Sequence, residues 1–123
     1  MPTEMIDITA LVGAAISEEK VESGICVVFT PHTTAAVTIN ENADPDVQYD
    51  IIHALEKTIP RNLPYRHSEG NSSAHVKSSL VGASELILVE NGRLVLGTWQ
   101  AIFFCEFDGP RQRKVIMKFL PAL

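Results

Sequence analysis

The chain of 123 residues has few cysteines, no excess of positive charge and no long hydrophobic run. Its two cysteines, Cys26 and Cys105, lie in apolar runs without metal-site spacing, which predicts buried free thiols in a reducing cytoplasm rather than a disulfide framework. The formal net charge of -5 argues against bulk attraction to nucleic acid or to an anionic membrane. No apolar run reaches the roughly 18 residues of a membrane span, and no signal peptide is expected at the N-terminus. We therefore expect a cytoplasmic protein that binds neither nucleic acid nor membrane.

The composition that remains is that of an ordinary globular protein. Hydrophobic residues make up 46% of the chain and charged residues 20%, as in a typical soluble domain. A chain of this length can bury a core without disulfides. The sequence contains no repeat, linker or low-complexity segment, so we expect a single domain over residues 1–123.

Hydrophobic periodicity predicts an α+β domain. The expected helices cover about 10–22, 45–59 and 73–82, and the expected strands about 25–30, 36–40, 84–90, 93–96, 99–107 and 115–120. Thr9 is expected to cap the first helix, and Asp44-Pro45 to open the second. Asn91-Gly92 predicts a tight hairpin turn.

Two further local patterns bear on the site. The second helix should bury a stripe of apolar residues, namely Ile51, Ile52, Leu55 and Ile59. Residues 61–72 show no periodicity, and a compact domain seldom carries so long a loop without using it.

The strand at 99–107 ends in an unusual cluster of charges. If the strand is regular, Glu106 shares a face with Ile102 and Phe104 and is desolvated. Desolvation raises the pKa of a carboxylate and suits it to proton transfer, whereas a nearby Arg111 or Arg113 lowers it. The two arginines can bind phosphate oxygens, or they can simply neutralise the carboxylates.

Three of the four histidines lie in loops or at element ends. His32 follows a strand, His67 lies in the long loop and His75 lies in the short helix, whereas His53 is expected to be a partly exposed structural residue. Three imidazoles can hold a metal ion and leave a position open for water or substrate. No pair has the spacing of a helical zinc motif, so histidines without a metal are the alternative.

Other polar residues accompany these candidates. Thr33 and Thr34 follow His32, Asn40 and Glu41 end the next strand, and Asn71 precedes His75. Each alone is typical of a turn or cap. Their concentration near the histidines makes them candidates for substrate binding.

Four segments in order resemble the YjbQ-like family. They are residues 31–41 (PHTTAAVTINE), the Tyr65-Arg66-His67 run with Asn71 and His75, residues 92–100 (GRLVLGTWQ) and residues 106–113 (EFDGPRQR). The last two blocks are highly specific, and the resemblance covers nearly the whole chain.

The resemblance implies a fold, an assembly and a reaction. The fold is a β-sandwich of mostly antiparallel strands with two or three helices, assembled as a homotrimer. The reaction is a secondary thiamine-phosphate synthase activity, which joins a pyrimidine pyrophosphate to a thiazole phosphate and releases pyrophosphate. Family members usually begin with a further strand before the segment 5–9, so the first strand is expected as a stub or the sheet edge is filled differently.

The site residues that follow fall into three groups. The metal ligands are expected to be His32, His67 and His75. The catalytic residues are expected to be Glu106, Asp108, Arg111 and Arg113, with Glu106 transferring protons. The substrate-binding residues are expected to be Thr33, Thr34, Asn40, Glu41, Asn71, Trp99 and Gln100.

The ligands and the assembly are expected to be as follows. Histidine ligands favour zinc, with nickel or magnesium as alternatives, and the substrate is a small phosphorylated molecule. A metal-assisted hydrolase and a non-enzymatic metal- or anion-binding module are the other readings. The apolar residues on both faces of the long strand, Ile102, Phe103 and Phe104, exceed what a small sandwich covers and favour the homotrimer.

Overall fold

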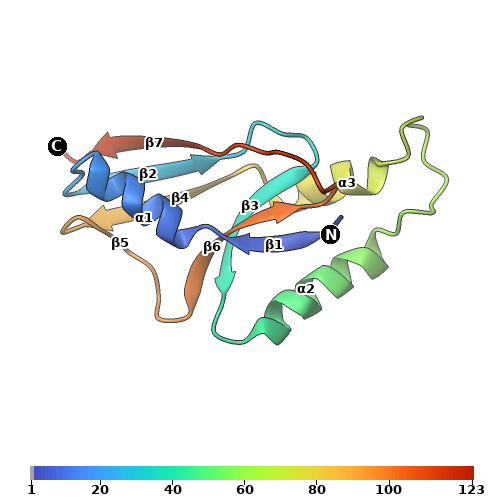
Figure 1. Cartoon of the computed structure of the whole chain (residues 1–123), viewed down its shortest axis with the longest axis horizontal. Helices are drawn as coiled ribbons and strands as arrows, with labels where there is room; N and C mark the ends of the chain where they lie inside the picture. The colour runs from blue at the N-terminus through green and yellow to red at the C-terminus, as the bar shows by residue number, and fades with distance from the viewer. Residues whose placement is uncertain (1) are drawn as a thin grey trace.

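The computed structural model describes residues 2–123, which form two antiparallel sheets and three helices (Figure 1). The three-stranded sheet has the order β1 (Glu4–Asp7), β6 (Gln100–Glu106), β3 (Ala35–Glu41). The four-stranded sheet has the order β5 (Arg93–Leu94), β4 (Ser84–Glu90), β2 (Gly24–Phe29), β7 (Ile116–Pro121). The helices are α1 (Thr9–Glu18), α2 (Pro45–Thr58) and α3 (Ser72–Val81). The expected α+β sandwich is confirmed, and β1 pairs with β6 at the edge of its sheet.

The two signals for tight local structure are confirmed. The Asp44 side chain accepts a hydrogen bond from the Asp46 N–H and Pro45 begins α2. Asn91 and Gly92 adopt φ values of 53° and 70° between β4 and β5, the positive pair that a two-residue hairpin turn requires.

The first helix is shorter than expected, and Thr9 does not cap it. The Thr9 hydroxyl instead accepts a hydrogen bond from the Ile102 N–H on β6, at 2.9 Å. Asp7 accepts the Thr9 N–H, also at 2.9 Å. The helix ends at Glu18, and Lys20 then takes a φ of 55° that turns the chain towards β2. Sequence periodicity does not report this turn, because Val21 after it still packs against the core.

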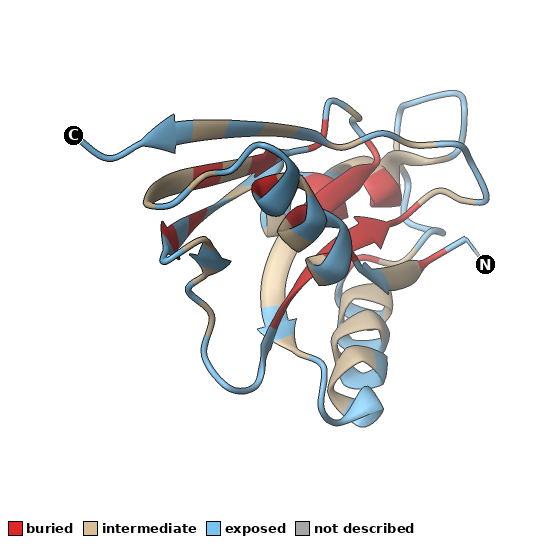
Figure 2. Ribbon diagram, turned by 60° about the vertical axis from the view of Figure 1, so that its left-hand side comes forward, coloured by how far each residue is buried: buried red, intermediate tan, exposed pale blue. Residues whose placement is uncertain are grey.

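Strand β6 lies between two clusters of buried residues (Figure 2). Ile102 and Phe104 pack with α1 and the four-stranded sheet, while Phe103 and Cys105 pack on the other face with Ala74 of α3. The expected alternation of the strand is therefore confirmed. Because both faces of β6 are covered within one chain, the expectation that the apolar residues Ile102, Phe103 and Phe104 drive association is wrong.

Exposed apolar residues gather on the other sheet. Cys26, Val28, Ile87 and Val89 point into the core, so the residues between them point outwards. The outward set, called the outer sheet face below, contains the apolar residues Ile25, Val27, Phe29, Leu86, Leu88, Ile116 and Leu120, with Lys118 opposite Val27.

Helix α2 lies at the periphery and buries none of its own residues (Figure 1). Of the expected stripe, only Ile59, just after the helix, is buried. Leu55 packs partly buried against the core, and a polar contact also holds the helix: the buried Lys77 donates to the Glu56 Oε1 at 2.8 Å, and the Thr3 hydroxyl donates to the same oxygen at 2.9 Å. Burial alone would raise the pKa of Glu56, but the Lys77 and Thr3 hydrogen bonds lower it overall.

Both cysteines are free and buried, as expected. Burial raises the pKa of Cys26, and it raises the pKa of Cys105 to about 12. The thiolate, which is the reactive form, is therefore suppressed at both positions. None of the helices among residues 2–123 has the length and hydropathy needed to cross a membrane.

Candidate functional site

The pairing of β3 with β6 brings the candidate residues together. Ala35, the first residue of β3, lies opposite Glu106, the last residue of β6. The pairing extends one step further, because the Phe107 N–H donates to the Thr34 carbonyl at 3.2 Å. Helix α3 is fixed to the same end, since the Ser78 hydroxyl donates to the Ala35 carbonyl at 2.6 Å. The loop before β3, the segment after β6 and the first turns of α3 thus meet at one place.

A cavity of about 380 Å³, called the histidine pocket below, lies at this meeting point. It is lined by Pro31, His32, Thr33, Thr34, His67, Glu69, Asn71, His75, Asp108, Arg111 and Arg113. Nine of these residues were expected from the sequence. Pro31 and Glu69 were missed, because neither residue type in a loop carries a specific signal.

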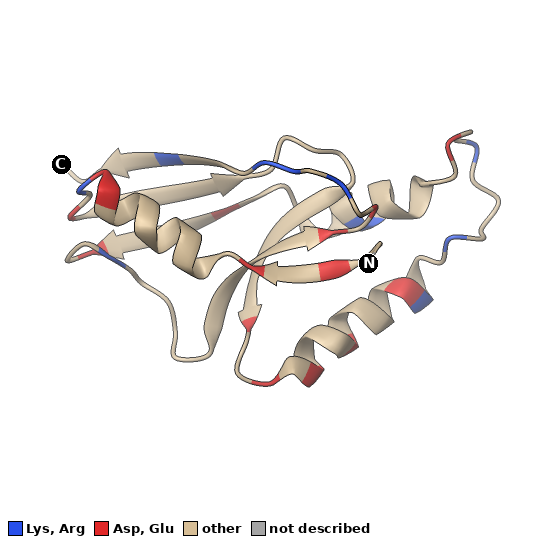
Figure 3. Cartoon of the chain, viewed as in Figure 1, with Lys and Arg blue, Asp and Glu red and all other residues tan. Residues whose placement is uncertain are grey.

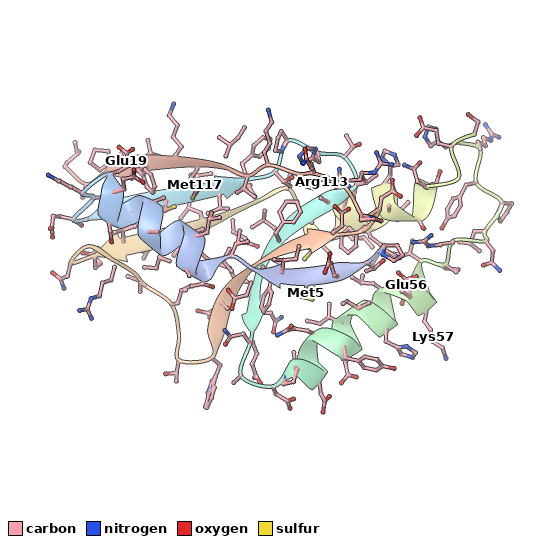
Figure 4. All side chains as sticks on the ribbon, viewed as in Figure 1. Met5, Glu19, Glu56, Lys57, Arg113 and Met117 are labelled. Atoms are coloured by element: carbon pink, nitrogen blue, oxygen red, sulfur yellow. The ribbon has the colours of Figure 1, made fainter. Side chains whose placement is uncertain are left out.

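Glu106 forms a buried ion pair with Arg113. Figure 4 labels Arg113. The Arg113 Nε donates to Glu106 Oε1 at 2.7 Å and its Nη2 to Oε2 at 2.6 Å, and the two side chains are 11% and 4% exposed. The Nη2 also donates to the Thr34 hydroxyl at 2.8 Å. Glu106 Oε2 further accepts the Asp108 N–H at 2.9 Å. Both ends of the carboxylate are therefore occupied.

This geometry argues against the expected role of Glu106 in proton transfer. Burial alone would raise the pKa of its carboxyl, but the hydrogen bonds from Arg113 and from the Asp108 N–H outweigh burial and lower it. The hydrogen bond to Glu106 likewise raises the pKa of Arg113. An ionised carboxylate held at both oxygens is poorly suited to transfer protons. The geometry indicates a structural role for Glu106 and Arg113, because their hydrogen bonds attach the segment before β7 to the ends of β3 and β6.

Arg111 differs from Arg113 in keeping donors for a ligand. Its Nε donates to the Asp108 carbonyl and its Nη2 to Asp108 Oδ2, both at 2.9 Å. These bonds orient a guanidinium that is 53% exposed. Of its five N–H groups, three have no hydrogen-bond partner among residues 2–123. A fixed guanidinium with free donors is suited to bind phosphate oxygens.

Asp108 and Asn71 support this arrangement. Asp108 Oδ2 accepts the Asn71 Nδ2 at 2.9 Å as well as the Arg111 Nη2. The Asn71 Oδ1 is buried and has no partner among the described residues. Asn71 also precedes α3, so the N-terminal end of this helix lies at the pocket, where its partial positive charge favours an anion.

The three histidines lie in different environments. The rings of His67 and His75 are neighbours, with centroids 5.5 Å apart and planes at 87°. The His32 Nε2 accepts the Lys114 N–H at 3.0 Å, so its proton is on Nδ1. Burial, followed by the charge of Arg113, lowers the pKa of His32. Outside the pocket, exposed His53 stacks on Tyr49 with ring centroids 5.9 Å apart.

The three histidines share one pocket but do not form a ready metal site. Among residues 2–123, no three His, Cys, Asp or Glu side chains are placed so that together they could hold a metal ion. His32 already uses Nε2 to bind the Lys114 N–H, whereas His67 and His75 adjoin. The expected convergence of all three within coordination distance is therefore wrong for this arrangement.

Four expected substrate-binding residues lie elsewhere. Asn40 and Glu41 end β3 opposite Ala101 and Gln100 at the start of β6, which is about 20 Å from the pocket end of these strands at about 3.3 Å per residue. Trp99 precedes β6 at the same far end and is 61% exposed. The Gln100 side chain accepts the Gly97 N–H at 2.8 Å, and the Asn40 side chain the Glu41 N–H at 2.8 Å. These residues organise a turn and do not reach the pocket.

Comparison with known proteins gives a consistent family. The family model described as "UPF0047 protein YjbQ-like" matches residues 1–122. The chain is 56% identical over 117 residues to a UPF0047 protein of Methanocaldococcus jannaschii, covering 95% of this chain and 85% of the relative. It is 54% identical over 118 residues to the UPF0047 protein YugU of Bacillus subtilis, covering 95% and 89%.

Solved structures agree with this result. A protein of the YjbQ/UPF0047 family from Clostridium acetobutylicum superposes with a TM-score of 0.96 at 57% identity, covering 98% of this chain and 93% of that one. A conserved hypothetical protein from Thermus thermophilus superposes with a TM-score of 0.92 at 45% identity, covering 98% and 94%.

Proposed function

The chain belongs to the UPF0047 YjbQ-like family, and we propose that it acts on a small phosphorylated molecule held in the histidine pocket. The observation that carries the proposal is Arg111, whose guanidinium is oriented by Asp108 and keeps three N–H groups free at a pocket lined by three histidines. Basic residues of the segment before β7 lie beside this end of β6 (Figure 3). A phosphate group suits such a set of donors.

The reaction we propose within this class is thiamine-phosphate synthesis. The thiazole nitrogen uses its lone pair to form a bond to the methylene carbon of the pyrimidine, and the carbon–oxygen bond to pyrophosphate breaks. Pyrophosphate leaves with the electron pair of that bond, so negative charge develops on the leaving group. Donors fixed at that position stabilise the transition state, and Arg111 is the residue placed to supply them. This bond exchange needs no proton from Glu106, in keeping with the pairing of that carboxylate.

Product analysis tests the proposal and separates it from its alternatives. We expect the pure protein to release pyrophosphate only when the pyrimidine pyrophosphate and the thiazole phosphate are both present. Release of inorganic phosphate from either compound alone would indicate a hydrolase. Binding of both compounds without any product would indicate a non-enzymatic binding module.

A divalent metal remains part of the proposal, with zinc as the expected ion and nickel or magnesium as alternatives. The adjacent imidazoles of His67 and His75 are the ligands the geometry offers, and histidine nitrogen favours zinc or nickel over magnesium. Bound, such an ion would supply positive charge near a phosphate.

We expect His75→Ala to remove metal from the purified protein and His53→Ala to leave it in place. His75 lines the pocket next to His67, whereas His53 stacks on Tyr49 outside it. Elemental analysis of both variants after dialysis gives the metal content per chain. Equal metal content in the two variants would remove His75 from the ligand set.

We also propose that the chain assembles as a homotrimer through the outer sheet face. This face presents seven apolar residues on three adjacent strands, and large exposed apolar patches mark association sites. Three copies of this face can meet about the threefold axis of a closed trimer, where each copy covers apolar residues of its neighbours.

We expect light scattering at micromolar concentration to give the mass of three chains. Leu88→Glu should shift the mass to that of one chain, because it places a charge among the apolar residues of the outer sheet face. Leu63→Glu, at a comparably exposed loop residue, is the matched control and should leave the mass unchanged. A monomer mass for the unmodified protein would contradict the assembly.

A further inference from the structure

A second cavity adjoins the histidine pocket across Arg111 and Arg113. It has a volume of about 380 Å³ and lies between β1, α1, the end of β6 and the segment before β7. We call it the apolar groove; its apolar walls are Ile6, Ile8, Leu11, Phe104, Pro110 and Val115, and Glu4 and the Arg113-paired Glu106 also line it. Arg111 and Arg113 line both cavities.

The two arginines between the cavities differ in their exposure and in the donors they keep for a ligand. Arg113 is 11% exposed and bound to Glu106 and Thr34, so it forms part of the wall. Arg111 is 53% exposed and keeps free donors. A ligand anion on Arg111 therefore has histidines on one side and an apolar surface on the other.

Part of the groove wall lies outside the core of the chain, although Ile8 and Phe104 belong to that core. Leu11 is 54% exposed and Ile6 is 42% exposed, although both point towards the groove. An apolar cavity of about 150 Å³ already takes up benzene, so the groove has room for a six-membered ring. Apolar walls with a few fixed polar groups are the usual make-up of a small-molecule site.

We propose that the apolar groove binds the ring of the phosphorylated ligand while Arg111 and the histidine pocket bind its phosphate. This inference rests on the proposed function and adds the place that holds the flat, largely apolar ring of such a phosphate compound. Charge complementarity at Arg111 and the apolar walls beside it favour this occupant over a purely polar phosphate ester.

Two phosphonates that cannot be hydrolysed test the proposal by calorimetry. Phenylphosphonate carries the ring and methylphosphonate is the matched probe without it. Burying one face of a ring, at about 25 cal/mol per Å², should make phenylphosphonate bind about 10–100-fold more tightly. Leu11→Asn should weaken phenylphosphonate about 3–10-fold and leave methylphosphonate unchanged, and Ile6→Thr should act in the same direction. Leu63→Asn, outside both cavities, should change neither.

The outcomes separate this inference from the proposed function. Equal affinity of the two phosphonates would overturn the ring site and leave the phosphate site standing. No binding of either probe would overturn both. A change of oligomeric mass in Leu11→Asn, with phenylphosphonate affinity unchanged, would assign the groove to contact between copies of the chain and overturn the ring site.

Discussion

Glu106→Gln is expected to lower the free energy of unfolding by about 3–5 kcal/mol at pH 7, the usual cost of removing one partner of a buried ion pair. The variant leaves the Arg113 guanidinium with its charge in a place where little water can solvate it. Urea unfolding measures the change as a shift of the midpoint.

The pH dependence of the free energy of unfolding tests the same prediction in a second way. The pKa of Glu106 lies below its ordinary value of 4.5 in the folded chain. The stability from this pair is therefore fully present above about pH 5 and is lost as the pH falls through 4.5 and below, because the unfolded chain takes up the proton first. Glu106→Gln should lose this part of the acid dependence, so its stability should fall less steeply between pH 5 and pH 3.

Two controls sharpen the result. Glu41→Gln changes a carboxylate at the opposite end of the same strand pair and should alter stability by less than about 0.5 kcal/mol. Glu106→Leu combined with Arg113→Met removes both charges and should be more stable than Glu106→Gln. If Glu106→Gln were as stable as the unmodified protein and lost only turnover, by the 10²–10⁴-fold typical of an acid–base residue, Glu106 would be a proton-transfer group after all.

Arg111→Met is expected to lower kcat/KM for thiamine-phosphate synthesis by about 10²–10³-fold, as removal of one fixed donor to a developing negative charge usually does. The fold should be kept, because the side chain is half exposed and bonds only to Asp108. Arg111→Lys should keep part of the activity with a higher KM, since lysine keeps the charge but cannot form the planar fork.

A distant arginine gives the matched control. Arg93→Met, on β5 in the other sheet, should leave kcat/KM within a factor of two. Steady-state release of pyrophosphate measures all three variants, and growth of a strain without the usual synthase gives an independent readout. Full activity in Arg111→Met would exclude Arg111 from the reaction.

The sequence predicted the parts of the fold that depend on residues close together in the chain. The Asn91-Gly92 turn, the Asp44 cap and the alternation along β6 each depend on residues within a few positions of one another, and the structure has all three. The burial of Cys26 and Cys105 likewise follows from the apolar strands that contain them. The sequence also indicated His32, His67, His75 and Arg111 as candidate residues of a functional site.

Only the tertiary structure decided how these residues combine. The antiparallel register of β3 and β6 places His32 beside the segment 107–114 and sends Asn40 and Trp99 to the far end. It also pairs Glu106 with Arg113 and leaves Arg111, which Asp108 orients, with unused donors. The sequence alone does not show which of the two arginines pairs with Glu106. Local sequence fixes conformation through nearby backbone and side-chain contacts, whereas the pairing of charges and the sharing of a cavity depend on strand register and on which faces are buried.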